Sequence, residues 1–329
     1  MPLRTAPLPR MAGDLTFMRS RRATIGDLDA EKLAILGAPV EDNVGRKSGT
    51  RFAPTALRET SVYFGWHANP QFSHPVDIDV RVPIDTSEMH GRLVDIGDIP
   101  LEGLPAAAVT QAIRTTMQEL HDSRASAILL GGDDSIVHPA IAASPRGPVG
   151  FIQIGGRLPA TMPSEVEAPS EDLPPLSRLL SDSAIIPRTT AVMSGAGSAG
   201  MEFLHDFRAA GGAIWSASEV RQSPPGAIEG FARSVAGSAG SLNVHFDVSA
   251  FRPSLHGMSE RPAFGGLTLP DLQKALGEIG RAPVSSLIVT GLNPTLSGLS
   301  VVKTGLRLTV TTLLAYIYGR LGLEAARRL

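Results

Sequence analysis

Two stretches of the chain place acidic side chains directly after segments typical of buried strands. The apolar residues 127–130 lead into Gly131-Gly-Asp-Asp-Ser135, and the alternating residues 242–246 lead into Asp247-Val-Ser249. Ligands and metals collect at the carboxyl ends of strands in an open α/β sheet. Carboxylates there could hold a hard divalent cation or bind a cationic ligand. Asp134 and Asp247 are therefore the first candidates for chemistry.

Three other groups of residues favour structural interpretations. Ser135 with His138 lacks a glycine-framed nucleophile elbow and an ordered acid partner, so the pair predicts a helix-start serine near a structural histidine. Gly195-Ala-Gly-Ser-Ala-Gly200 has the glycine spacing of a dinucleotide-binding turn, but no acidic residue ends a clean following strand, which favours an ordinary strand-to-helix turn. Asp95 and Asp98 are expected to be turn and cap residues.

The elements that must position these residues alternate along the chain. Apolar runs predict strands at 32–39, 92–96, 125–130, 149–154, 190–193, 213–216, 241–247 and 284–290. Amphipathic or capped segments predict helices at 54–64, 104–123, 200–210, 227–236, 269–279 and 306–322. This alternation predicts one mainly parallel sheet covered by helices on both faces. We expect an N-terminal arm over residues 1–25 and a single domain over 26–329.

Composition excludes several functional classes. The 329 residues carry a net charge of -2, which provides no broad basic field for nucleic acid or acidic membranes. The chain has no cysteine, so disulfides, thiolate metal sites and a cysteine nucleophile are excluded. No apolar run reaches the ~18 residues of a membrane span, and no signal-peptide segment is recognisable. These features predict a cytoplasmic protein.

The acidic residues 159–175 predict a solvated loop, with a lid or subunit contact as the alternative.

Several motifs in order resemble the ureohydrolase family, which includes arginase, agmatinase, guanidinobutyrase and formimidoylglutamase. They lie between about Leu33 and Leu321 and comprise Gly37-Ala-Pro39, Gly49-Thr-Arg-Phe-Ala-Pro54 with Leu57-Arg58, Val94-Asp-Ile-Gly-Asp98, Phe246-Asp-Val-Ser-Ala-Phe-Arg-Pro253 and Gly265-Gly-Leu-Thr268. The resemblance implies a three-layer α/β/α fold with a mainly parallel sheet. It also implies, in active members, two divalent ions, usually manganese or nickel, that bridge an activated hydroxide.

The chain departs from the family at the metal ligands. The six ligand positions of active members fall on Asp134, Gly155, Arg157, Pro159, Asp247 and Ser249. Glycine and proline have no side-chain donor, and an arginine is permanently cationic. Only Asp134 and Asp247 remain plausible ligands, so we expect neither a catalytic residue nor a metal in this chain.

The remaining charges predict what replaces the metal. We expect Arg157 to bond with Asp134 or Asp247, because an arginine and a carboxylate satisfy each other through charge-assisted hydrogen bonds. The alternative is a single metal held by Asp134, Asp247 and either His245 or His138, although His245 is expected to point to the opposite face of its strand. The family's substrate-binding glutamate falls on Gly291, so a guanidinium ligand would lose its main counter-charge.

A complete scaffold without its ligands suggests an inactive structural or regulatory subunit. The resemblance implies a trimer or hexamer, with a paralogous subunit that binds nickel or manganese as partner. The chain is similar to the ligand-poor subunit of two-component metformin hydrolases, nickel-dependent relatives that hydrolyse a biguanide. Two alternatives stay open, namely an active amidinohydrolase with a remodelled site and a metal-free ligand-binding module.

Overall fold

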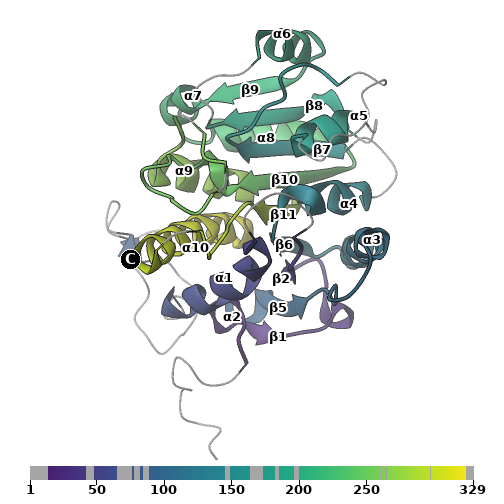
Figure 1. The fold of residues 1–329 in the computed structure, drawn as a ribbon, viewed down its shortest axis with the longest axis vertical. Helices are drawn as coiled ribbons and strands as arrows, with labels where there is room; N and C mark the ends of the chain where they lie inside the picture. Colours follow the sequence, from purple (N-terminus) through teal and green to yellow (C-terminus); the bar gives the residue numbers. More distant parts are fainter. Residues whose placement is uncertain are drawn as a thin grey trace, which may run out of the picture.

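The fold is built on a mainly parallel sheet that runs the length of the molecule (Figure 1). The computed structural model describes residues 14–41, 48–64, 76–77, 82–83, 89–144, 149–163, 173–181, 185–195, 200–259, 261–263, 265–296 and 298–323. Within these residues the main sheet has nine strands, all paired in parallel. In spatial order they are β1 (Arg21–Arg22), β5 (Leu93–Asp98), β2 (Leu33–Ala38), β6 (Ser126–Gly131), β11 (Val284–Thr290), β10 (Ser241–Asp247), β7 (Val149–Gly155), β8 (Ile185–Ser194) and β9 (Ala213–Ser216).

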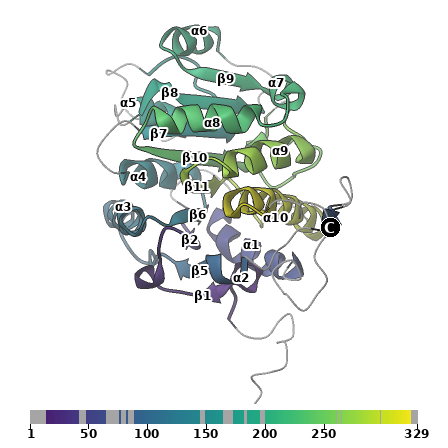
Figure 2. The same cartoon turned by 180° about the vertical axis from the view of Figure 1, so that it is seen from behind.

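Helices cover both faces of the sheet (Figures 1 and 2). One face is covered by α1 (Ala53–Ser61), α2 (Met89–Arg92), α7 (Ala217–Gln222), α8 (Ala227–Gly237), α9 (Leu269–Gly280) and α10 (Leu299–Leu321). The other face is covered by α3 (Ala106–Ser123), α4 (Val137–Ala142), α5 (Pro175–Ser181) and α6 (Met201–Ala209). The predicted three-layer α/β/α arrangement is confirmed. No helix in the described ranges combines the length and apolarity needed to cross a bilayer.

The two faces of the central strands carry different side chains. In β10, Leu242, Val244 and Phe246 lie in the core under α8, α9 and α10. The intervening Asn243, His245 and Asp247 are also buried, and the alternation of a strand places them on the opposite face. The sheet therefore has a buried polar row that leads to the carboxyl end of β10.

Most predicted elements are present, with ends shifted by a few residues. Part of the segment expected to be an arm packs on the domain, because β1 pairs with β5 and the side chains of Phe17 and Met18 are buried. A two-stranded antiparallel sheet, β3 (Val76–Asp77) with β4 (Val82–Pro83), lies between α1 and α2, where the sequence predicts no strand. Residues 164–172 of the acidic segment lie outside the described residues, and so does most of the predicted solvated loop, whose alternative is a lid or subunit contact.

A buried arginine anchors the amino-terminal half of the sheet. Arg58 on α1 donates from Nε and Nη2 to the two carboxylate oxygens of Asp95, at 2.8 and 3.0 Å, and also bonds Asp98. Asp95 is fully buried and accepts from the backbone N–H groups of Phe17 and Gly97 as well. The expectation that Asp95 and Asp98 are turn and cap residues is therefore incomplete: they hold the cation that joins α1 to β5.

Helices α9 and α10 approach so closely that glycine is required at their contact. A Cβ atom on Gly319 would lie 2.2 Å from the backbone oxygen of Gly277. An alanine in place of Gly277 has room, because its Cβ would lie 3.5 Å from the nearest atom outside its own helix, the backbone oxygen of Ala315. The two glycines therefore have opposite tolerance for a methyl group.

We predict that Gly319→Ala destabilises the protein and that Gly277→Ala does not. Overpacking costs about 1–3 kcal/mol, which exceeds the ~1 kcal/mol that alanine gains over glycine in a helix. Gly277→Ala should keep that gain and leave stability unchanged or raised. Urea unfolding of both variants measures the difference, and equal midpoints would contradict the packing argument.

Candidate active site

The loop after β6 is held by glycines and by an aspartate cap. A Cβ on Gly132 would lie 1.9 Å from the backbone oxygen of Val40, so only glycine fits there. Asp133 then caps the short helix Asp134–Ile136 by accepting from the backbone N–H of Ser135 at 3.0 Å. The hydroxyl of Ser135 donates to the same carboxylate. The prediction of a structural serine is confirmed, and this cap directs the following Asp134 toward the strand ends.

Arg157 reaches Asp134 from the loop after β7. Its Nη1 donates to Oδ2 of Asp134 at 2.9 Å, and the two side chains are only 17% and 12% exposed. Gln153 supports this loop by donating from Nε2 to the backbone oxygen of Arg157 at 2.9 Å. The predicted Arg157–Asp134 ion pair is confirmed. It places a guanidinium group where the family resemblance implies metal ligands.

The end of β10 lies beside this pair. Asp247 Oδ1 accepts from the backbone N–H of Ser249 at 2.8 Å, and the Ser249 hydroxyl accepts from the backbone N–H of Gly156 at 3.1 Å. Burial raises the pKa of the Asp247 carboxyl and nearby Asp134 acts in the same direction, whereas the Ser249 contacts and Arg157 oppose them. Asp134, Arg157 and Asp247 therefore share one electrostatic environment.

His245 faces the site, contrary to the expectation from the sequence. It lies two residues before Asp247, and residues two apart in a strand share a face. Burial lowers the pKa of its imidazole, with smaller and opposite effects from the charges of Asp134 and Arg157. The imidazole is 1% exposed, and its Nε2 lies 2.8 Å from the Thr290 hydroxyl. The prediction that His245 points to the opposite face from Asp247 is therefore wrong.

Gly155, Pro159 and Gly291 complete the predicted set. Gly155 is at the end of β7, where a Cβ atom would lie 3.5 Å from Cβ of Asp247. Pro159 is buried two residues beyond Arg157. Gly291 has a φ of 82° and follows β11, where a Cβ atom would lie 2.6 Å from Oδ1 of Asp247. The structure therefore brings together the ends of four neighbouring strands, as the resemblance implies.

The donor set at these strand ends does not fit a pair of divalent ions. Two hard dications require several converging carboxylates and imidazoles, whereas Asp134 here bonds a guanidinium group. In the described part of the chain no group of three or more His, Cys, Asp or Glu side chains is placed to hold a metal ion. Arg157 supplies positive charge of its own at this position.

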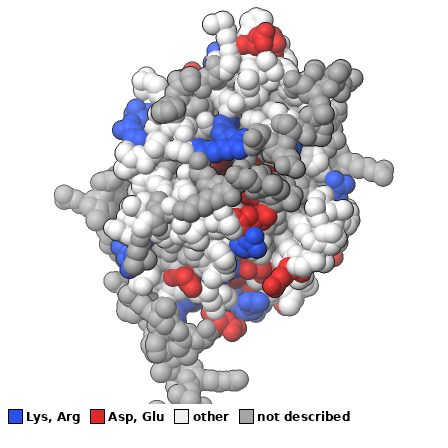
Figure 3. All heavy atoms as spheres, viewed as in Figure 1, with Lys and Arg blue, Asp and Glu red and all other residues white. Residues whose placement is uncertain are grey.

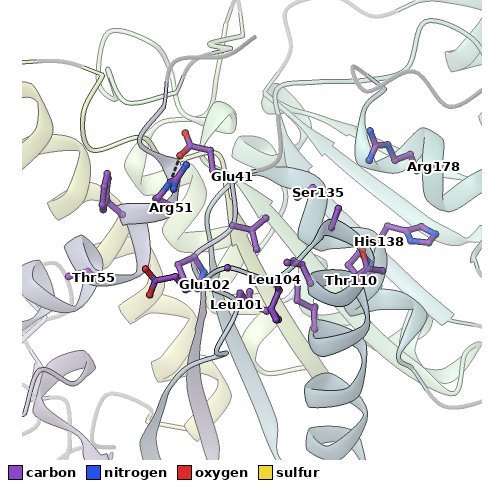
Figure 4. Close-up of a pocket in the computed structure, with 18 of the residues that line it drawn as sticks. Glu41, Arg51, Thr55, Leu101, Glu102, Leu104, Thr110, Ser135, His138 and Arg178 are labelled. Carbon is purple, nitrogen blue, oxygen red and sulfur yellow. Dashed lines mark hydrogen bonds and ion pairs between the residues drawn. The ribbon is translucent and has the colours of Figure 1, made fainter. Parts of the chain in front are cut away.

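A second concave region lies beside the site and was not predicted. This region, named here the α3–α4 pocket, encloses about 930 Å³. Its walls come from the end of β2, the loop after β5, α3, α4, α5 and the short helix Thr50–Phe52 (Figure 4). Ser135 and His138 line it, together with Arg51 of the Gly49–Pro54 motif and with Glu41, Glu102 and Arg178, which no sequence motif singled out. Residues from so many separate segments give no local spacing signal.

We predict that Arg157→Met destabilises the protein because it leaves Asp134 without this guanidinium. Removing one partner of a buried pair costs about 3–5 kcal/mol, and the residual exposure here places the expected loss at about 2–3 kcal/mol. The double variant Arg157→Met, Asp134→Asn should recover much of this loss, since neither of the two substituted positions then carries a charge. Urea unfolding of the four proteins in this cycle gives the coupling energy. A loss below about 0.5 kcal/mol in Arg157→Met would mean that the pair behaves as a surface ion pair.

The loss of folding stability at acidic pH should depend on His245. Burial lowers the pKa of its imidazole from 6.5 to about 4, so the unfolded chain binds a proton at a higher pH than the folded one. The stability from this group is complete above pH 6.5 and is lost as the pH falls toward 4, with a slope of roughly 1 kcal/mol per pH unit. His245→Gln should flatten the decline, leaving the parallel contribution of His256, whose pKa burial also lowers to about 4. Urea midpoints between these pH limits test this, and an unchanged slope would contradict it.

Comparison with known proteins places the chain in a family. The Arginase family model matches residues 31–314. The chain is 25% identical to the guanidinopropionase of Pseudomonas aeruginosa over 269 residues, which cover 81% of this chain and 80% of that protein. It is 29% identical to the guanidinobutyrase of the same organism over 160 residues, 46% of this chain and 45% of that protein.

Solved structures agree on the fold. The formimidoylglutamase of Bacillus subtilis superimposes with a TM-score of 0.72 at 21% identity, covering 98% of this chain and 96% of its own. A hypothetical agmatinase from Burkholderia thailandensis superimposes with a TM-score of 0.69 at 21% identity, covering 94% of this chain and 91% of its own. With the family model matching most of its length, the chain belongs to the Arginase family, the ureohydrolases that act on guanidino compounds.

Proposed function

We propose that this chain is a catalytically inactive structural or regulatory subunit of a hetero-oligomeric ureohydrolase. Its partner is a paralogous subunit that carries the complete metal site, with nickel or manganese. The substrate of the complex is a guanidino or biguanide compound, as in the two-component metformin hydrolases. The observation that carries the proposal is the Arg157–Asp134 ion pair at the converging strand ends.

The chemistry of the site supports inactivity of the chain alone. Hydrolysis of a guanidino group requires an activated hydroxide, and in this family two metal ions supply it. Asp134 is engaged by Arg157, and Asp247 has a raised pKa that disfavours the anionic form a cation would need. A pair of metal ions that could activate a water molecule would therefore lack the converging carboxylates and imidazoles that hold it in active members.

The substrate position supports the same proposal. A guanidinium ligand needs a carboxylate opposite it, and Gly291 supplies no side chain there. The positive charge of Arg157 would also repel a guanidinium or biguanidinium cation. The scaffold is nevertheless intact from β1 to α10, which favours a role in assembly.

The test compares the chain purified alone with the chain co-expressed with a paralogue that has all six metal ligands. After incubation with Ni²⁺ or Mn²⁺, we expect no stoichiometric metal and no release of urea or amine from guanidino compounds or metformin by the lone chain. The co-purified complex should contain metal and turn over. Metal and turnover in the lone chain would refute the proposal.

A matched variant separates a supporting subunit from a remodelled enzyme. Asp247→Asn removes the buried carboxylate with little change of shape. A supporting subunit carrying this substitution should leave the turnover of the complex within about twofold, because the chemistry occurs in the partner. An amidinohydrolase that uses its own remodelled site would lose activity by orders of magnitude.

One observation favours the metal-free binding module as a second candidate, namely the α3–α4 pocket.

A further inference from the structure

We propose that a pocket lined by Arg233, Arg281 and Arg320 binds a small molecule that carries two linked phosphate groups. This region, named here the arginine pocket, encloses about 810 Å³ between α8, α9 and α10. These three helices lie side by side on one face of the sheet (Figure 2). The proposal goes beyond the proposed function and holds whether or not the chain is catalytically active.

The arginine pocket lies at the opposite end of the sheet from the candidate active site. Arg320 donates from Nε to the hydroxyl of Ser126 at 2.8 Å, and Ser126 is the first residue of β6. Arg281 follows α9 and lies three residues before the start of β11. The candidate active site is built at the carboxyl ends of the strands, and none of its residues lines this pocket. A ligand in the arginine pocket therefore occupies a site of its own.

Three arginines of the pocket share one carboxylate. Nε of Arg233 donates to Oε1 of Glu229 at 2.9 Å, and Nη1 of Arg281 lies 3.7 Å from Oε2 of the same residue. Arg320 donates to the hydroxyl of Ser126, which carries no charge. Among the described residues that line the pocket, Glu229 is the one acidic side chain. Three guanidinium groups less one carboxylate leave an excess of two positive charges.

The ends of two helices offset part of this excess. Arg233 donates from Nη2 to the backbone oxygen of Arg281 at 2.6 Å, and Arg92 donates from Nη1 to that of Leu321 at 2.8 Å. A helix C-terminus is equivalent to about half a negative charge, so the ends of α9 and α10 together offset roughly one positive charge. An excess of about one charge remains, and this count does not include Arg92, which also lines the pocket.

Arg281 has the geometry to bind an anion. Its side chain is 46% exposed, and within the described residues its contact with an acid is the 3.7 Å ion pair with Glu229. A guanidinium group donates two parallel N–H bonds to the oxygens of a phosphate. Glu229 itself shows that a pair of anionic oxygens fits between Arg233 and Arg281. Two linked phosphates extend further than one carboxylate, so they can engage more than one of these arginines.

The size of the pocket and the charge of the whole chain favour a small ligand. The volume of about 810 Å³ falls within the ~300–1,000 Å³ typical of small-molecule sites. The face in Figure 3 shows basic and acidic side chains interspersed, without a large field of one sign. The net charge of the chain is -2, which disfavours nucleic acid and acidic membranes as the source of the phosphate.

Inorganic pyrophosphate is the probe that tests this site. We expect the full chain to bind one equivalent in calorimetric titration, in the presence of KCl and without divalent cations. Arg281→Gln should weaken this binding about tenfold, the effect of losing a charge-assisted hydrogen bond. Arg188→Gln is the matched control, because Arg188 is exposed on β8 and does not line the pocket. It should leave the affinity unchanged within twofold.

A substitution of the opposite sign tests whether the charges of the pocket act together. Glu229→Gln removes the carboxylate that competes for Arg233 and Arg281, so it should tighten pyrophosphate binding severalfold. Both glutamine variants change only exposed or half-buried ion pairs, and urea unfolding should show that they stay folded. The proposal is overturned if the full chain does not bind pyrophosphate, if Arg281→Gln and Arg188→Gln weaken it equally, or if Glu229→Gln weakens it.

Discussion

Asp95 and Asp134 are largely buried carboxylates that each need a positive partner, and this requirement joins separate segments of the molecule. Asp95 meets it with the bidentate guanidinium of Arg58, and Asp134 meets it with Arg157. Both arginines come from a different segment than their carboxylate, so each ion pair also fixes the position of a loop or helix. The cost of burying charge is offset only where such pairs are also hydrogen-bonded. Charge compensation at the strand ends is therefore inseparable from the fold that creates those ends.

The sheet itself does not depend on what compensates those charges. Its stability comes from two apolar layers, one under α8, α9 and α10 and one under α3 and α4. None of the six ligand positions of the family contributes a large apolar side chain to either layer. The sequence at these positions can therefore change without loss of the architecture.

The fold and the position of the site were predictable because they depend on local patterns. Buried runs such as residues 127–130 and glycine turns such as Gly131-Gly132 identify strands and their ends, and parallel strands bring those ends together. A bond from Arg157 to Asp134 or Asp247 followed from charge alone, and the structure shows it at Asp134. The predicted orientation of His245 is wrong, because residues two apart in a strand share a face. The α3–α4 pocket was missed because its walls combine segments as distant in sequence as Glu41 and Arg178.

The backbone at Gly291 limits which side chain this position can carry. Gly291 adopts a φ of 82°, and any Cβ there would lie 2.6 Å from the Asp247 carboxylate. Side chains other than glycine rarely adopt that conformation, so a glutamate at 291 would require the loop after β11 to move. That loop is tied to the loop after β6 by the bond from Gly291 N–H to the Gly132 oxygen at 3.0 Å. Restoring a substrate carboxylate therefore requires coordinated changes in two loops, and exchanging Arg157 alone leaves both in place.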